Sequence, residues 1–141
     1  MLQILLAEDN YADVLLVQQA LRAHDIGCEL HVARDGEQAL NYVTHMGQPG
    51  GMPCPDLLLL DLNLPKADGA QVLREFRQHP ECASTPVIIV TSSDAPNDRA
   101  SVNQLGVSRY FLKPLDLDAF LQLGETVREV IAVEQSRDRQ I

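Results

Sequence analysis

The feature that most constrains the fold is an alternation of short apolar runs with segments of helical periodicity, repeated five times. In the helical segments, apolar side chains recur every three or four positions, whereas the short runs between them are strand-like. The predicted strands are residues 2–7, 29–33, 57–60, 86–91 and 108–112. The predicted helices are residues 11–24, 35–43, 68–78, 97–105 and 116–134, with Asn10, Asp35, Asp68 and Asp116 as N-caps. This order predicts an α/β domain with a parallel sheet, right-handed crossovers and helices on both faces.

The core is expected to be aliphatic. Aromatic residues make up only 4% of the chain and tryptophan is absent, so leucine, valine, isoleucine and alanine must fill the interior. The run of four leucines at residues 57–60 shows no polar alternation, which predicts a strand buried on both faces. A length of 141 residues corresponds to about one domain. The Gly- and Pro-rich residues 46–55 are interpreted as an internal connection rather than a domain linker.

Charge and composition exclude several classes of function. A net charge of −9 disfavours binding to nucleic acid and to anionic membranes. No apolar run approaches the roughly 18 residues that a membrane span needs. The apolar start of the chain has no basic segment and meets Glu8 and Asp9 at once, so it is not read as a signal peptide. Three cysteines, far apart and odd in number, predict no disulfide framework, and the cytoplasm is the expected compartment.

Polar side chains stand where the predicted strands end. Glu8 and Asp9 follow the first strand, Asp61 follows the third, Thr91 ends the fourth and Lys113 follows the fifth. Ligands of open α/β sheets bind outside the carboxyl ends of the strands. We therefore expect three carboxylates, a hydroxyl and an ammonium to gather at one edge of the sheet.

The three carboxylates predict a site for a hard cation. Crowded carboxylates repel one another, so they either retain protons or are neutralised by a positive ion. Oxygen ligands favour Mg²⁺, the usual ion where carboxylates and a phosphate share a site. Asp9 and Asp61 are the expected direct ligands, and Glu8 is expected to bind either directly or through water.

A metal-bound carboxylate beside a lysine and a hydroxyl is the constellation of a phosphoryl acceptor. Aspartyl phosphates are a known class of covalent intermediate, and phosphoryl transfer depends chiefly on positioning and charge stabilisation. Asp61 is the expected nucleophile, with Lys113 and the Thr91 hydroxyl on the phosphoryl oxygens. Ser92 is the alternative source of the hydroxyl.

Four motifs combine these residues in a familiar order. They are residues 7–10 (Ala-Glu-Asp-Asn), 60–69 (Leu-Asp-Leu-Asn-Leu-Pro-Lys-Ala-Asp-Gly), 90–92 (Val-Thr-Ser) and 110–114 (Tyr-Phe-Leu-Lys-Pro). Over about residues 1–130 the chain resembles the receiver domain of bacterial two-component response regulators. The Asp-Leu-Asn-Leu-Pro-Lys string and the Gly- and Pro-rich insert are similar to stand-alone regulators paired with phytochromes. Glu8 stands where many members of the family have aspartate.

The resemblance implies a flavodoxin-like fold with strand order 2-1-3-4-5, bound Mg²⁺ and a histidine kinase as phosphodonor. It also implies that Tyr110 is a rotameric switch coupled to Thr91, and it favours a cis Lys113–Pro114 bond. Asn63 is expected to lend its backbone carbonyl to the metal.

The expected organisation is a receiver domain over residues 1–135 and a short charged tail over 136–141, with no output domain. The signal must then leave as a phosphorylation-dependent change of surface that a partner protein reads, or as phosphate relayed to a histidine phosphotransfer protein. The last helix carries Leu123, Val130 and Val133 partly off its core face. These residues either widen the buried face or mediate a homodimer.

Two other functions are disfavoured by the residues at the strand ends. A metal-dependent phosphatase with an aspartyl phosphate needs a general acid two residues after the nucleophile, where this chain has Asn63. A flavin-binding electron carrier needs a phosphate-cradling loop after the first strand, where the acidic Glu8 and Asp9 would repel a phosphate. A phospho-accepting switch that is not a conventional enzyme is therefore the favoured function.

Overall fold

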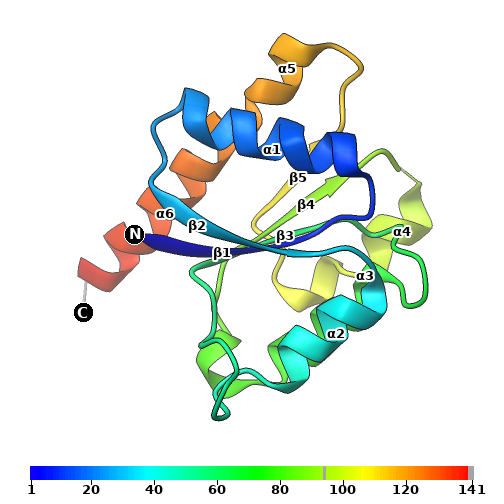
Figure 1. Cartoon of the computed structure of the whole chain (residues 1–141), viewed down its shortest axis with the longest axis vertical. Coiled ribbons are helices and arrows are strands. Elements are labelled where there is room, and N and C mark those ends of the chain that lie inside the picture. The colour runs from blue at the N-terminus through cyan, green and yellow to red at the C-terminus, as the bar shows by residue number, and fades with distance from the viewer. Residues whose placement is uncertain (94, 140–141) are drawn as a thin grey trace.

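The sheet has the predicted parallel topology. In the computed structural model, which describes residues 1–93 and 95–139, five strands pair in parallel in the order β2-β1-β3-β4-β5 (Figure 1). The strands are β1 (Leu2–Ala7), β2 (Cys28–Ala33), β3 (Leu57–Leu60), β4 (Val87–Thr91) and β5 (Arg109–Leu112). Each prediction of a strand is confirmed to within one residue at either end, and the flavodoxin-like order is confirmed as well.

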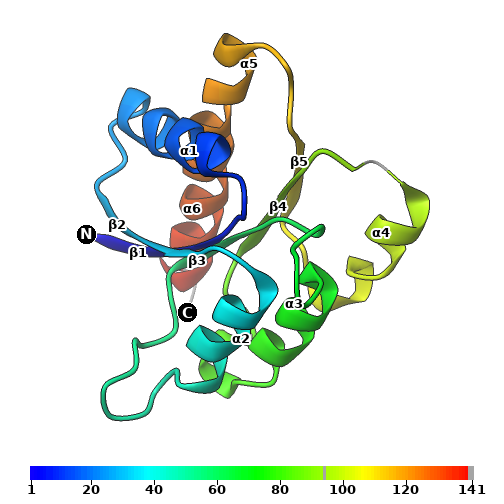
Figure 2. The same ribbon diagram turned by 45° about the vertical axis from the view of Figure 1, so that its right-hand side comes forward.

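Helices cover both faces of this sheet. One face carries α1 (Tyr11–Ala23), α5 (Leu117–Leu121) and α6 (Leu123–Arg139), and the other carries α2 (Gly36–Thr44), α3 (Gly69–Arg77) and α4 (Pro96–Ala100) (Figures 1 and 2). Each of the four predicted N-caps accepts a hydrogen bond from the backbone N–H three residues later. The caps fix where the helices leave the carboxyl edge of the sheet.

The core lies in two aliphatic layers, one on each face of the sheet. All four leucines of β3 are fully buried, as the unbroken apolar run predicted, and they alternate between the two layers. Phe76 on α3 fills one layer and Phe120 on α5 fills the other. Between them these layers hold the strands rigidly, so the residues at the strand ends keep fixed positions.

Two predicted helices are interrupted. The segment predicted as a helix over 97–105 is divided into α4 and a short 3-10 helix at Asn103–Leu105, because the Ser101 hydroxyl donates to the Asp98 carbonyl, 2.6 Å away, and competes with the helix backbone. The last helix ends at Leu121 and restarts as α6. At its start, Gly124 lies so close to α1 that an added Cβ would lie 2.4 Å from the Ala20 carbonyl oxygen.

The end of the chain also differs from the expected tail. The helix predicted to end at residue 134 continues as α6 to Arg139, so the tail predicted at 136–141 begins as helix. Residues 140 and 141 of that tail lie outside the described residues. Among the helices that the structure describes, none is both long enough and apolar enough to cross a membrane.

The prediction that the cysteines form no disulfide was wrong. Cys54 and Cys82 are 28 residues apart in sequence, yet they are bonded, with their Cα atoms 5.8 Å apart. The fold brings the segment before β3 against the short 3-10 helix Pro80–Cys82 that follows α3. That Cα separation is ordinary for a disulfide, and sequence spacing could not reveal it.

Candidate functional site

The predicted residues meet at the carboxyl edge of the sheet. Glu8, Asp9 and Asp61 each place a carboxylate oxygen within 4.8 Å of the other two. The Lys113 ammonium lies 2.9 Å from Asp61 Oδ2, and the Thr91 hydroxyl donates to Asp61 Oδ1 across 3.1 Å. The structure thus assembles all five of the strand-end residues around one carboxylate.

Local backbone contacts hold Asp61 at the centre of the site. Its N–H donates to the Ala7 carbonyl, which continues the β1–β3 pairing beyond the strand. Its Oδ1 accepts from the Asn63 N–H at 3.0 Å, so the side chain is fixed as well. Gly69 packs against this turn so closely that an added Cβ would lie 2.5 Å from the Asp61 carbonyl oxygen. Glycine is therefore required at the start of α3.

Lys113 is held by three carboxylates. Its Nζ lies 2.6 Å from Glu8 Oε1, 2.8 Å from Asp13 Oδ2 and 2.9 Å from Asp61 Oδ2. Burial alone would lower the pKa of Lys113, but hydrogen bonds to Asp13, Glu8 and Asp61 raise that pKa above its ordinary value. The Lys113 ammonium is therefore charged at neutral pH.

The backbone of Lys113 continues the β4–β5 ladder, with its N–H donating to the Thr91 carbonyl at 2.8 Å. The Lys113–Pro114 peptide bond, which the resemblance favoured as cis, is trans. Trans is the lower-energy form for bonds to proline, by roughly 0.5–1 kcal/mol. The backbone of Lys113 is thus fixed at the end of β5, and from there its ammonium reaches the Asp61 carboxylate.

Glu8 is the most buried of the acidic groups, with 1% of its side chain exposed. Burial raises the pKa of Glu8 from 4.5 to about 7; Lys113 lowers this pKa and the nearby Asp61 charge raises it. Four carboxylates, counting Asp13, face a single ammonium, so the site has a surplus of negative charge. Such a donor set of hard oxygen ligands fits Mg²⁺.

Two predictions about neighbouring side chains concern this edge. Thr91 is buried with its hydroxyl on Asp61, whereas Ser92 is exposed. That Thr91 rather than Ser92 donates to the phosphoryl group stays a prediction. The Asn63 side chain donates to the Thr91 hydroxyl at 3.5 Å. That the Asn63 carbonyl binds the metal stays a prediction.

Tyr110 lies on β5, opposite Ile89 of the strand that ends at Thr91, and is half-buried. Its hydroxyl donates to Asn103 Oδ1 at 2.5 Å, and the Arg99 guanidinium stacks on its ring at 4.6 Å from the centroid. Tyr110 therefore joins the strand next to the site to the helix α4 and to the 3-10 helix that follows it. Its role as a switch stays a prediction.

Sequence reasoning missed Asp13, in the first turn of α1, as a site residue. In the structure its carboxylate binds Lys113. A signal was present in the sequence: Asp13 precedes the buried Val17 by four residues, so an acidic side chain stands on the apolar stripe of the helix.

Comparison with known proteins agrees with this geometry. Residues 4–124 match the response regulator receiver domain. The chain belongs to the response regulator receiver family. As a member of that family it is a phosphorylation-dependent signalling switch of two-component systems rather than a conventional enzyme, and its acidic cluster is consistent with Mg²⁺-dependent phosphorylation of an aspartate.

Several proteins of known role are similar to this receiver. The response regulator Rcp1 of Synechocystis sp. is 41% identical over 124 residues, which are 88% of this chain and 84% of that protein. The phosphorylated cyanobacterial phytochrome response regulator RcpA superposes with a TM-score of 0.80 at 36% identity, over 91% of both chains. The receiver domain of the histidine kinase PA1611 from Pseudomonas aeruginosa superposes with a TM-score of 0.72 at 26% identity, over 93% of this chain and 98% of that one.

The last of these structures has a magnesium ion coordinated in its active-site cleft. Receiver domains bind Mg²⁺ at the acidic site, and the oxygen donors of Glu8, Asp9 and Asp61 supply that site here. Membership of the family also implies a histidine kinase as partner. Composition, fold and site thus lead to the same function.

Proposed function

We propose that Asp61 is the residue that accepts the phosphoryl group. The observation that carries this proposal is the contact of Lys113 Nζ with the Asp61 carboxylate, 2.9 Å apart, inside the acidic cluster. One Asp61 oxygen bonds to phosphorus while the bond from phosphorus to the donor breaks. A bound Mg²⁺ would supply positive charge to the phosphoryl oxygens, held by Glu8, Asp9, Asp61 and the Asn63 carbonyl.

Lys113 and Thr91 complete the proposed acceptor. The Lys113 ammonium neutralises one phosphoryl oxygen, and the Thr91 hydroxyl, which now donates to Asp61, turns to donate to another. Their fixed places at the ends of β4 and β5 support these roles, because phosphoryl transfer depends on positioning.

The proposed output is a change in the face formed by α4 and β5. Movement of Thr91 toward the phosphoryl group would free space beside Tyr110 on the next strand. The bonds from Tyr110 to the α4 region support this route, because rotation of the ring would break its contacts with Arg99 and Asn103. A downstream protein reads this face, or the phosphoryl group passes on to a histidine phosphotransfer partner.

We infer that the phosphodonor is a phytochrome-type histidine kinase. The family implies the kinase, and relatives such as RcpA, a phytochrome response regulator, support the narrower assignment. Large apolar side chains that remain exposed on α1 and on the segment from β5 into α5 flank the site and suit a protein donor. These side chains are Tyr11, Leu15, Leu112, Leu115 and Leu117.

We also propose that residues 1–135 form the receiver domain and that it acts in the cytoplasm. The apolar start of the chain supports this location, because it forms β1, an interior strand between β2 and β3, with Ile4–Ala7 buried in the core.

The first test is treatment with acetyl phosphate, with Mg²⁺ or with excess EDTA, followed by intact-mass analysis and peptide mapping. We expect one phosphoryl group, placed on Asp61, and only in the samples that contain Mg²⁺. Adduct formation in EDTA at the same rate, or an adduct on another residue, would contradict the proposal. Phosphotransfer from a purified phytochrome kinase then tests the donor.

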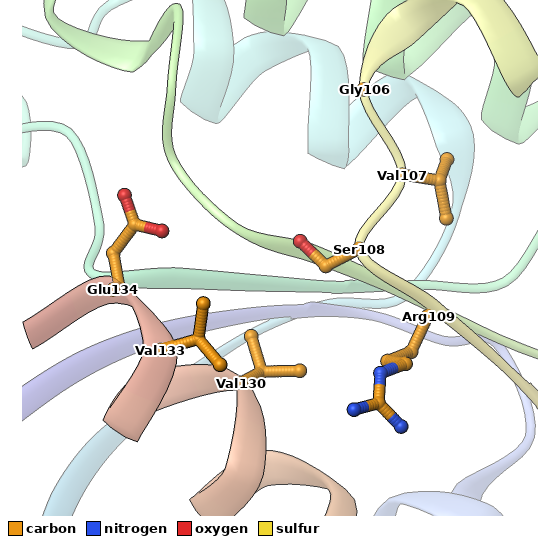
Figure 3. Close-up of a pocket in the computed structure, with 7 residues that line it drawn as sticks. All are labelled: Gly106, Val107, Ser108, Arg109, Val130, Val133 and Glu134. Atoms are coloured by element: carbon orange, nitrogen blue, oxygen red, sulfur yellow. The ribbon is translucent and has the colours of Figure 1, made fainter. Parts of the chain in front are cut away.

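We further propose that the last helix mediates a homodimer. Leu123 and Val130 are buried, so of the three residues considered from the sequence only Val133 remains on the surface, 50% exposed. It lines a groove of about 470 Å³ between α6 and the segment that leads into β5 (Figure 3). The ion pair Arg109–Glu129, 3.3 Å long, spans the same two elements. Apolar and charged groups of both signs make this face self-complementary.

Sedimentation velocity over a range of concentrations tests the dimer, with and without beryllofluoride as a phosphoryl mimic. Val133→Asp should weaken self-association at least about tenfold, because it places a charge in an apolar contact. The control is Leu15→Asp, which places the same charge at an exposed apolar position on α1 and should leave self-association unchanged. A monomer at every concentration in both states would exclude the dimer.

A further inference from the structure

One of the three carboxylates that hold Lys113 stands apart from the other two. Glu8 and Asp61 belong to the acidic cluster that fits a metal, whereas Asp13 does not. Asp13 comes instead from the first turn of α1, and its Oδ2 lies 2.8 Å from Nζ of Lys113. The ammonium therefore joins the metal-binding carboxylates to a carboxylate that no cation at the cluster would use.

This difference matters once a divalent cation is bound at the acidic cluster. A divalent cation on Glu8, Asp9 and Asp61 takes up the charge of two of the three partners of Lys113. Lysine carries its charge on a flexible four-carbon stem, so an ammonium released by two partners is free to swing away from the site. Asp13 is the partner that still holds it.

Asp13 is itself well placed for this task. Its backbone N–H donates to the Asn10 side chain at 3.2 Å, so the first turn of α1 is fixed by an N-cap. Only 20% of the Asp13 side chain and 11% of the Lys113 side chain are exposed. Water competes weakly for a charged pair that is this well shielded, so the contact persists.

We propose that Asp13 is a positioning residue for phosphoryl transfer: its carboxylate keeps the Lys113 ammonium beside Asp61 while the other partners of Lys113 are engaged. The inference rests on the proposed roles of Asp61 and Lys113. Asp13 does not touch the phosphoryl group and acts only through Lys113.

The first test observes the ammonium directly. The chain has only two lysines, so ¹⁵N-labelled lysine gives a two-signal spectrum. Lys113 is held by carboxylates, whereas the Lys66 side chain is 60% exposed and serves as the internal reference. With Mg²⁺ present we expect a slowly exchanging Lys113 ammonium signal in the wild type and in Asp118→Asn, and its loss in Asp13→Asn. Asp118 is a matched control because it is an exposed aspartate in the first turn of α5.

The second test measures the rate of phosphorylation by acetyl phosphate. Asp13→Asn should slow it about tenfold, because the ammonium is no longer held in place, and Asp13→Glu should recover part of the rate. In a Lys113→Ala background, Asp13→Asn should have no further effect. Circular dichroism confirms that each variant is folded.

Three results would overturn the inference. They are an unchanged Lys113 signal in Asp13→Asn, a wild-type rate in that variant, or the same tenfold loss when Lys113 is already alanine. These results differ from a failure of the proposed function. In that case the wild type itself would accept no phosphoryl group on Asp61.

Discussion

Asp61→Asn should fold normally and accept no phosphoryl group from acetyl phosphate or from a kinase. An amide lacks the nucleophilic oxygen of a carboxylate, so the covalent step is lost rather than slowed. The fold should survive, because the asparagine Oδ1 can still accept from the Thr91 hydroxyl and from the Asn63 N–H. Intact-mass analysis in the presence of Mg²⁺ measures the adduct, and thermal unfolding measures the fold.

The matched control for this variant is Asp118→Asn, which removes the same charge from an exposed position on α5. It should take up one phosphoryl group at the rate of the wild type. If Asp61→Asn gained the adduct at an undiminished rate, the acceptor would be another residue. The proposed roles of Lys113 and Thr91 would then be wrong as well, because both are inferred from their contacts with Asp61.

The architecture was predictable because its signals are local. Buried parallel strands appear as unbroken apolar runs, so the four leucines of β3 could be recognised without knowledge of their neighbours. The caps follow the same logic, since Asp35 and Asp68 bind backbone groups three residues away. The site followed from topology, because the carboxyl ends of parallel strands meet at one edge.

The features that were missed depend on distance in space. The Cys54–Cys82 bond and the contact between Asp13 and Lys113 join residues far apart in the chain. No local pattern pairs the two cysteines, and the position of Asp13 on the apolar stripe of α1 does not by itself identify Lys113 as its partner. The break between α5 and α6 lies next to Gly124, which packs too closely against α1 to accept a side chain, and this contact too is tertiary. A helix boundary set by packing cannot be found from helix propensity alone.

Burial, which a sequence does not give, also decides the electrostatics of the site. Glu8 and Asp9 are neighbours in sequence, yet Glu8 is buried and Asp9 is exposed. For Glu8, desolvation outweighs the attraction of Lys113, and its pKa rises to about 7. The acidic cluster is therefore a source of instability in the absence of a cation.

In the metal-free protein, Glu8 should weaken the fold as the pH rises. In the unfolded chain Glu8 ionises near its ordinary pKa of 4.5, whereas in the folded protein its pKa is about 7. The folded state thus binds more protons between these two values, and the stability that protonated Glu8 provides is lost as the pH rises through them. The loss should reach about 3 kcal/mol of the free energy of unfolding.

Urea unfolding followed by circular dichroism, in EDTA at several pH values from 4.5 to 8, measures this effect. Because other groups titrate too, the informative quantity is the difference between the wild type and Glu8→Gln. That difference should grow in favour of Glu8→Gln as the pH rises and should level off above about pH 7. Glu37→Gln changes an exposed position on α2, and its free energy of unfolding should depend on pH as that of the wild type does.

Saturating Mg²⁺ should remove most of this pH dependence in the wild type. The bound cation neutralises the ionised Glu8 carboxylate and so compensates for the hydration that the carboxylate loses on burial. Glu8→Gln has one carboxylate fewer for the cation and should gain less stability from it. A constant difference between the wild type and Glu8→Gln across the whole pH range would mean that Glu8 ionises normally in the fold. The ion pair with Lys113, 2.6 Å long, would then balance the burial of the Glu8 carboxylate, and ionisation of Glu8 would not destabilise the metal-free protein.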